Sequence, residues 1–123
     1  MSNATSIVIP SGSTQGKAVK IAATSTPGTT IHTTGVSATT LDRLYMFAVN
    51  SDTVDRNLTI EFGGTTSPDN LIQVFPVPFK QGLVLVVDGL PLIGNGGSGL
   101  TVGAFASATN VIMVYAYILR VVP

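Results

Sequence analysis

The sequence predicts an all-β protein, an antiparallel β-sandwich of seven to nine short strands. Short runs of β-branched and aromatic residues recur, and turn-forming residues separate them every ~8–12 positions. No segment has the apolar period of a helix. Strands of this length usually pack as two sheets, so a jelly-roll-like sandwich is the preferred form. The 123 residues make one domain that is large enough for a core.

Residues 1–40 differ in composition from the rest of the chain, because they are rich in Ser, Thr, Ala and Gly. Three weakly patterned stretches, 6–9, 18–23 and 29–34, are candidate strands. The region is either an N-terminal arm or the first strands of the sandwich, and composition leaves both open. Residues 41–123 are expected to form the sandwich core of a single overall domain.

Residues 41–64 are the most clearly patterned part of the chain. They predict strands at 44–50 and 57–62 that form a hairpin around a polar turn. Positions 58, 60 and 62 are apolar and positions 57, 59 and 61 are polar, so one face of the second strand is buried and Glu61 points to water. The first strand is apolar on both faces and needs cover on both, inside a sandwich or at an interface.

The remaining strands follow from similar signals. Residues 71–78 are expected at a sheet edge, because Pro76 and Pro78 cannot donate to a ladder. The run 83–87 should end at Asp88-Gly89, before a further apolar stretch at 90–93. After a glycine-rich loop at 94–99, Gly103 in the strand 100–106 indicates a bulge or a close backbone contact.

The longest predicted strand, 111–122, carries large side chains that are expected on both of its faces. It is either a central core strand or a strand at a subunit interface, where tyrosines are enriched. With the two-faced strand 44–50, it supplies these interface candidates: Tyr45, Phe47, Val49, Met113, Tyr115, Tyr117 and Leu119.

Composition limits the classes of partner. Hydrophobic residues make up 45% and charged residues only 10%, and six basic and six acidic residues cancel. Such a surface provides little repulsion between copies, so we expect assembly. The scattered basic residues do not form the stripe that nucleic acid requires. The longest apolar run is too short for a membrane helix, and there are no cysteines.

The motifs that could bind a cofactor or metal are incomplete. Residues 94–99 match G-x-G-x-x-G, but a strand follows them and no acidic residue occurs after Asp88, so an inter-strand loop is expected instead. Asn50, Asp52 and Asp55, with Asp42 or Asp69 as helpers, could offer oxygens to Ca²⁺. Turn chemistry also explains these residues, and we predict neither a cofactor nor a metal.

No catalytic residue is predicted, and the chain is not expected to be an enzyme. His32, the only histidine, lies between threonines and is interpreted as a surface or stacking residue. The Ser and Thr residues do not form a nucleophile elbow. Glu61 is an isolated carboxylate, whereas a glycosidase needs a second one facing the first.

Three further segments are distinctive: TLDRLYMFAVNSDTVDRNLTIEFGGTTSPDN (40–70), VVDGLPL (86–92) and ATNVIMVYAYILRV (108–121). Together they resemble a family of small structural proteins of tailed bacteriophages. The resemblance implies a capsid decoration, or cement, protein that binds the assembled head and stabilises it. It also implies a β-sandwich and a trimer, with the major capsid protein or another virion protein as partner.

Under this resemblance the protein would be made in the host cytoplasm and would lie on the capsid surface of the virion. The alternative is a carbohydrate-binding jelly roll or another module of the neck or tail. A carbohydrate module would need exposed aromatic residues beside Asp or Asn in loops, and the aromatic residues here fall mostly in strands.

Overall fold

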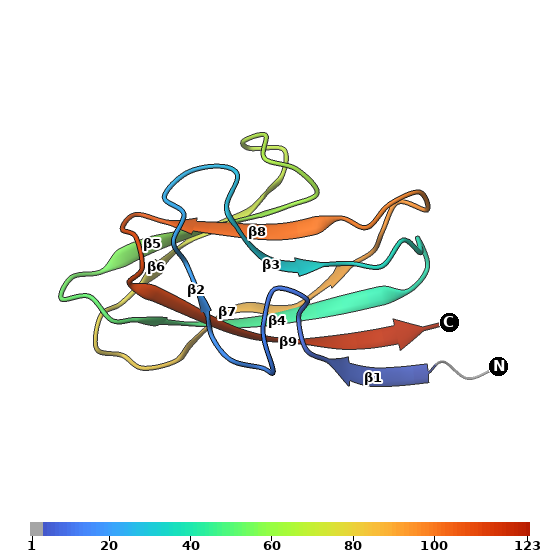
Figure 1. The fold of residues 1–123 in the computed structure, drawn as a ribbon, viewed down its shortest axis with the longest axis horizontal. Coiled ribbons are helices and arrows are strands. Elements are labelled where there is room, and N and C mark those ends of the chain that lie inside the picture. The colour runs from blue at the N-terminus through green and yellow to red at the C-terminus, as the bar shows by residue number, and fades with distance from the viewer. Residues whose placement is uncertain (1–3) are drawn as a thin grey trace.

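The computed structural model describes residues 4–123, which form two antiparallel sheets packed face to face and contain no helix (Figure 1). The prediction of an all-β sandwich is therefore confirmed. The strands are β1 (Ala4–Val8), β2 (Val19–Lys20), β3 (Thr29–Thr33), β4 (Leu41–Asn50), β5 (Arg56–Phe62), β6 (Leu71–Val77), β7 (Val84–Leu92), β8 (Thr101–Ala106) and β9 (Ile112–Val122). No helix in residues 4–123 is long and apolar enough to span a membrane.

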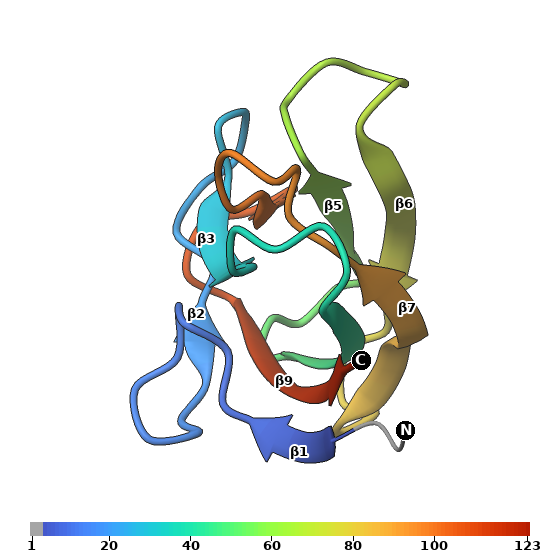
Figure 2. The same cartoon turned by 90° about the vertical axis from the view of Figure 1, so that its right-hand side faces the viewer.

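The first sheet has the strand order β1-β9-β4-β7, with β2 also paired to β9, and is called sheet A here. The second, sheet B, has the order β3-β8-β5-β6. Figure 2 shows the two layers from one end, with β1 and β9 in one layer and β3 and β5 in the other. The long pairing of β4 with β9 runs without a break from Leu41↔Val121 to Asn50↔Ile112 and forms the centre of sheet A.

The core lies between the sheets and follows from strict alternation along each strand. In β4 the side chains of Leu44, Met46 and Ala48 are fully buried, whereas the residues between them face outward. Ile112 and Ile118 of β9 are buried in the same way. Burying one such aliphatic side chain contributes about 1.5–3 kcal/mol, so these inward residues hold the sheets together.

Three predicted details of the strands are wrong. β4 and β5 do not form a hairpin, because β4 belongs to sheet A and β5 to sheet B. The stretch 18–23 forms only the two-residue strand β2. β7 does not end at Asp88-Gly89 but continues to Leu92, because Gly89 adopts a positive φ of 79° where the register with β4 shifts.

The segment 4–40 contributes β1 and β2 to sheet A and β3 to sheet B. β6 lies at an edge of sheet B, as predicted from Pro76, whereas Pro78 lies just beyond the end of the strand. The register of β3 with β8 shifts beside Gly103, as a bulge would require, but the backbone approach is not close, because an added Cβ would make only an ordinary contact with Gly28 at 3.8 Å.

Candidate interaction surface

The outer face of sheet A is covered by large apolar side chains, and we call it the aromatic face. Residues that lie opposite each other on neighbouring strands point to the same face of the sheet. The register therefore shows which side chains form each cross-strand row. Phe47 lies between Leu85 and Tyr115, and Leu119 lies beside Ile7. The aromatic face consists of Ile7, Leu41, Tyr45, Phe47, Val49, Leu85, Met113, Tyr115, Tyr117 and Leu119.

Its aromatic rings are ordered by contacts with one another. Tyr45 and Tyr117 stack with their ring centroids 4.7 Å apart and their planes 9° from parallel. The ring centroids of Phe47 and Tyr117 lie 6.4 Å apart, with their planes 23° from parallel. The Tyr45 ring also covers Gly89, where an added Cβ would lie 3.0 Å from the ring. Aromatic pairs of this kind contribute about 0.5–1.5 kcal/mol beyond the area that they bury.

Much of this face is open to solvent. Ile7 is 72% exposed, Leu85 45%, Tyr115 41% and Tyr117 38%. The outer face of a solvated antiparallel sheet normally carries polar residues. Apolar patches of this kind are typical of interaction sites. Arg43 is the charged residue within the face, where it pairs in register with Leu119. Charged residues lie beside it: Lys20 pairs in register with Met113, and Asp88 with Tyr45.

All seven interface candidates named from the sequence lie on the aromatic face. Their role as interface residues stays a prediction. The expectation that the large side chains of 111–122 occupy both faces is wrong, because residues two apart in a strand point the same way. Met113, Tyr115, Tyr117 and Leu119 face outward together, while Ile112, Val114 and Ile118 fill the core.

The sequence did not single out Ile7, Leu41 or Leu85. The run 83–87 is aliphatic throughout, so it contains no polar alternation from which the outward position of Leu85 could be read. Ile7 belongs to the weakly patterned first 40 residues. Both residues join the aromatic face only through pairing with β9 and β4.

His32 is not the surface or stacking residue that was expected, because it is only 2% exposed. Its Nε2 lies 2.8 Å from Oδ2 of Asp42, and Arg120 donates to both oxygens of the same carboxylate at 2.8 and 2.9 Å. His32 belongs to sheet B, whereas Asp42 and Arg120 form a register pair in sheet A. The cluster therefore links the two sheets.

The contacts of the cluster assign the donor and acceptor roles of the His32 ring nitrogens. The backbone N–H of Ser11 donates to Nδ1 at 3.1 Å, so Nδ1 carries no proton and Nε2 donates to Asp42. Burial raises the pKa of the Asp42 carboxyl, but hydrogen bonds from Arg120 and His32 outweigh this effect and hold the pKa below its ordinary 3.8. The same carboxylate raises the pKa of Arg120.

This arrangement is structural, although it contains two members of a hydrolytic triad. A general base needs a free ring nitrogen facing a nucleophile. Both nitrogens of His32 are bonded, and the hydroxyl of Ser11 accepts from the backbone N–H of Thr33. The buried ring also leaves no space for a substrate.

The candidate Ca²⁺ ligands are used by the turn between β4 and β5. Asn50 donates to the carbonyls of Val54 and Val77, and its oxygen accepts from the backbone N–H of Asp52. Asp52 pairs with Arg56 at 2.6 Å, and Asp55 accepts from a backbone N–H. No group of three or more potential metal ligands occurs in residues 4–123.

The glycine-rich segment 94–99 is a turn closed by its own side chain. Oδ1 of Asn95 accepts from the backbone N–H groups of Gly97 and Ser98. Gly94 packs so closely on the 35–36 backbone that an added Cβ would lie 2.2 Å from a carbonyl oxygen. The strand β8 follows, and no helix N-terminus is present here to receive a phosphate.

Glu61 points to the outer face of sheet B as predicted, but it is not in open water. The residue is only 4% exposed and lies at the side of a hollow of about 180 Å³.

Comparisons of the chain with protein-family models, with curated proteins and with solved structures found no match. The functional interpretation therefore depends on the surfaces described above.

Proposed function

We propose that the protein is a structural protein of a bacteriophage virion, a capsid decoration subunit that binds the assembled head and stabilises it. The single observation that carries the proposal is the aromatic face, with exposed fractions of 72% at Ile7 and 45% at Leu85. In the assembled state this face would be covered by neighbouring protein. The sequence resemblance to small tailed-phage structural proteins supports the same assignment.

The strand order supports the finer proposal that the sandwich is a jelly roll. From β2 onward the chain changes sheet at every connection except that between β5 and β6. The resulting orders, β1-β9-β4-β7 and β3-β8-β5-β6, are those of two interleaved Greek keys. Jelly rolls recur in viral capsid proteins and lectins, so the fold is compatible with the proposal but does not carry it.

The proposed mechanism is linkage between binding and assembly. A subunit that binds only the assembled lattice stabilises it by RT ln(1 + [L]/Kd), which is about 2.7 kcal/mol at one hundred times the Kd. A trimer at a capsid symmetry axis would add avidity, because each further contact is intramolecular. Such a subunit needs apolar contact area and no catalytic group.

The test is co-sedimentation of the purified protein with expanded heads of the phage that encodes it. We expect the wild-type protein to pellet with heads at micromolar concentration. Tyr115→Asp introduces a charge at a 41% exposed position of the aromatic face and should weaken binding at least tenfold. Val74→Asp is the matched control, because Val74 is 49% exposed but belongs to sheet B. Wild-type protein that stays in the supernatant would refute the proposal.

A further inference from the structure

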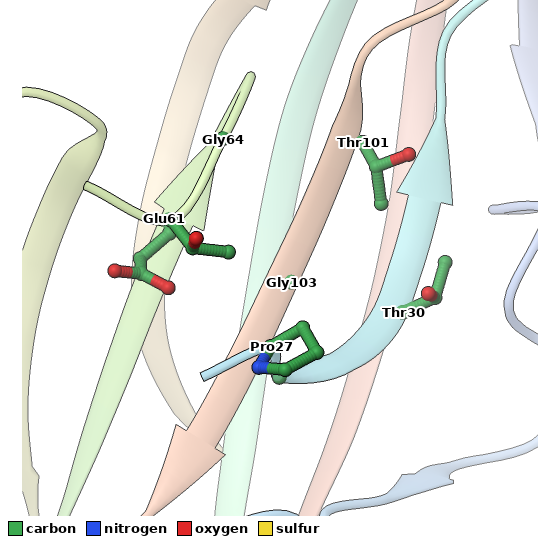
Figure 3. A pocket seen from close by; sticks show the side chains of 8 residues that line it. Pro27, Thr30, Glu61, Gly64, Thr101 and Gly103 are labelled. Carbon is green, nitrogen blue, oxygen red and sulfur yellow. The ribbon is translucent and has the colours of Figure 1, made fainter. Parts of the chain in front are cut away.

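A hollow on the outer face of sheet B, on the opposite side of the sandwich from the aromatic face, has the features of a small ligand site. Figure 3 shows Glu61 on one side, Thr30 and Thr101 on the other, and Gly103 and Pro27 between them. The hollow has a volume of about 180 Å³. Its lining consists of Pro27, Gly28, Thr30, Glu61, Gly64, Thr65, Thr101 and Gly103.

The hollow exists because β8 has no side chain at its floor. Gly103 lies in register between Thr30 of β3 and Glu61 of β5. A Cβ added at Gly103 would meet no atom closer than 3.8 Å. A Cβ therefore fits at this strand position, and a larger side chain would project into the hollow.

Glu61 is the only charged residue of the lining, and its charge has no partner in the described chain. The ion pairs of residues 4–123 involve the carboxylates of Asp42 and Asp52, not that of Glu61. No side-chain hydrogen bond within residues 4–123 involves Glu61, and no fully enclosed side-chain oxygen of these residues lacks a partner, so the Glu61 oxygens keep access to solvent. A glutamate carboxylate is negative at neutral pH, and in a recess it attracts a cation more strongly than in open water.

We propose that this hollow binds a primary ammonium group carried on a short carbon chain. The Glu61 carboxylate would neutralise the ammonium, and the hydroxyls of Thr30 and Thr65 would accept its two remaining N–H groups. The Thr101 hydroxyl is already hydrogen-bonded to Thr33 at 3.0 Å. The three glycines and Pro27 offer carbon surface to the alkyl part. The hollow of about 180 Å³ is several times larger than the space that a single water molecule requires, so it can admit a ligand of four to five non-hydrogen atoms.

The lining chemistry disfavours a divalent metal. Ca²⁺ requires about 6–8 oxygen ligands, usually including several carboxylates. The hollow offers one carboxylate, and residues 4–123 contain no group of three potential metal ligands. The ammonium can belong to a free amine or to a lysine side chain of another protein, since both present the same group. This inference is independent of the virion proposal.

The experiment titrates ¹⁵N-labelled protein with butylammonium and records amide chemical shifts. We expect saturable shifts around Glu61 and Gly103 with a Kd of about 1–10 mM, the weak range for a ligand of five non-hydrogen atoms. Glu61→Gln, which keeps the shape and removes the charge, should weaken binding at least tenfold. Gly103→Val should abolish it by filling the hollow.

Controls separate charge recognition from unspecific effects. Asp69→Asn removes an exposed carboxylate from the neighbouring loop and should leave the affinity unchanged. The neutral probe 1-butanol should produce no saturable shift. Equal affinity for 1-butanol, or unchanged affinity in Glu61→Gln, would overturn the proposal.

A final titration distinguishes the two sources of the ammonium group. Nα-acetyl-lysine methylamide presents the group as a polypeptide would. Binding comparable to that of butylammonium assigns the hollow to a lysine side chain. Binding of butylammonium alone assigns it to free amines, because the flanking peptide groups would then be excluded from the hollow.

Discussion

Asp42 joins the two sheets at the end of the sandwich where β3 leads into β4. Its side chain is only 2% exposed and accepts hydrogen bonds from His32 in sheet B and from Arg120 in sheet A. A carboxylate is costly to bury unless its oxygens are paired. The bidentate guanidinium and the imidazole N–H supply those partners, so the cluster is stable only as a unit.

Loss of the Asp42 charge should destabilise the fold and change its response to acid. We expect Asp42→Asn to lower the free energy of unfolding by about 2–3 kcal/mol at pH 7, because Arg120 loses its counter-ion. The pKa of Asp42 is below 3.8 when folded, so its contribution is present above this value and is lost as the pH falls through the folded pKa. Urea denaturation between pH 2 and 7 measures both effects.

Asp52→Asn provides the comparison for this acid dependence. Asp52 also pairs with an arginine, but the side chains of Asp52 and Arg56 are 22% and 31% exposed. Exposed pairs contribute little to stability. The Asp52 variant should therefore unfold nearly like the wild type at pH 7. If Asp42→Asn also behaved like the wild type from pH 2 to 7, the cluster would have no structural role.

Part of this cluster could be predicted from the sequence. Asp42 lies two residues before Leu44 and Arg120 two residues after Ile118, so the alternation that defines the core places both on inward positions. His32 could not be placed in this way. Its partner depends on how β3 packs across the sandwich onto β4, and no local pattern encodes that contact.

At the scale of the element, β7 shows how one glycine allows a long strand to fit under an aromatic ring. Gly89 has a φ of 79° and lies under the Tyr45 ring, and its carbonyl accepts from Arg43 at 3.3 Å. A side chain at this position would be strained by its backbone and would also contact Tyr45. The backbone conformation of Gly89 therefore affects both the register of β7 with β4 and the position of the Tyr45 ring on the aromatic face.

Gly89→Ala should destabilise the protein by about 1–3 kcal/mol through the positive φ and the contact with Tyr45. The stacked Tyr45–Tyr117 pair should also be disturbed, which would reduce the tyrosine signal in near-UV circular dichroism. Urea denaturation and the near-UV spectrum of the folded variant measure the two effects separately.

Gly82→Ala isolates the backbone part of this cost. Gly82 has a similar φ of 74°, but an added Cβ would meet nothing within 4 Å. We expect a smaller loss of stability, of about 1 kcal/mol, and an unchanged near-UV spectrum. Equal effects of the two substitutions on spectrum and stability would show that contact with Tyr45 is unimportant.

The limits of the strands could be predicted from the sequence better than the pairing between strands. The limits of β5, β6 and β9 agree with the predicted ranges to within a residue, because alternation and proline are local signals. The pairing of β4 with β5 was predicted wrongly. A short polar turn is typical of a hairpin, but the turn at 51–55 carries the chain from sheet A to sheet B, and its residues do not distinguish the two paths.

At the scale of the whole molecule, the two outer faces of the sandwich differ in chemistry. Sheet A presents the aromatic face, whereas sheet B presents the row of Phe105, Thr59 and Val74 and the Glu61 hollow. The asymmetry gives the protein one face to bury and one to leave in water. The low charge content of the sequence predicts that apolar side chains lie on the surface. The sheet on which they lie depends on which alternate residues of each strand face the core.

The aromatic face should also make the isolated protein associate with itself. The formal net charge of the chain is zero, so electrostatic repulsion between copies is weak. We expect sedimentation velocity at about 10–100 µM to give a mass that rises with concentration above the 12.7 kDa of one chain. The proposed trimer would have three times that mass.

Leu85→Lys combined with Tyr115→Lys places two like charges in one cross-strand row of the face, on either side of Phe47, at positions 45% and 41% exposed. Copies of this variant should repel one another and sediment as single chains, with little change in stability, because neither residue lies in the core. Val74→Lys adds a charge to sheet B and should associate like the wild type. If the wild-type protein remained a single chain at 100 µM, the tyrosine and leucine side chains of this sheet would be stable in contact with water. The aromatic face would then not be a self-association interface.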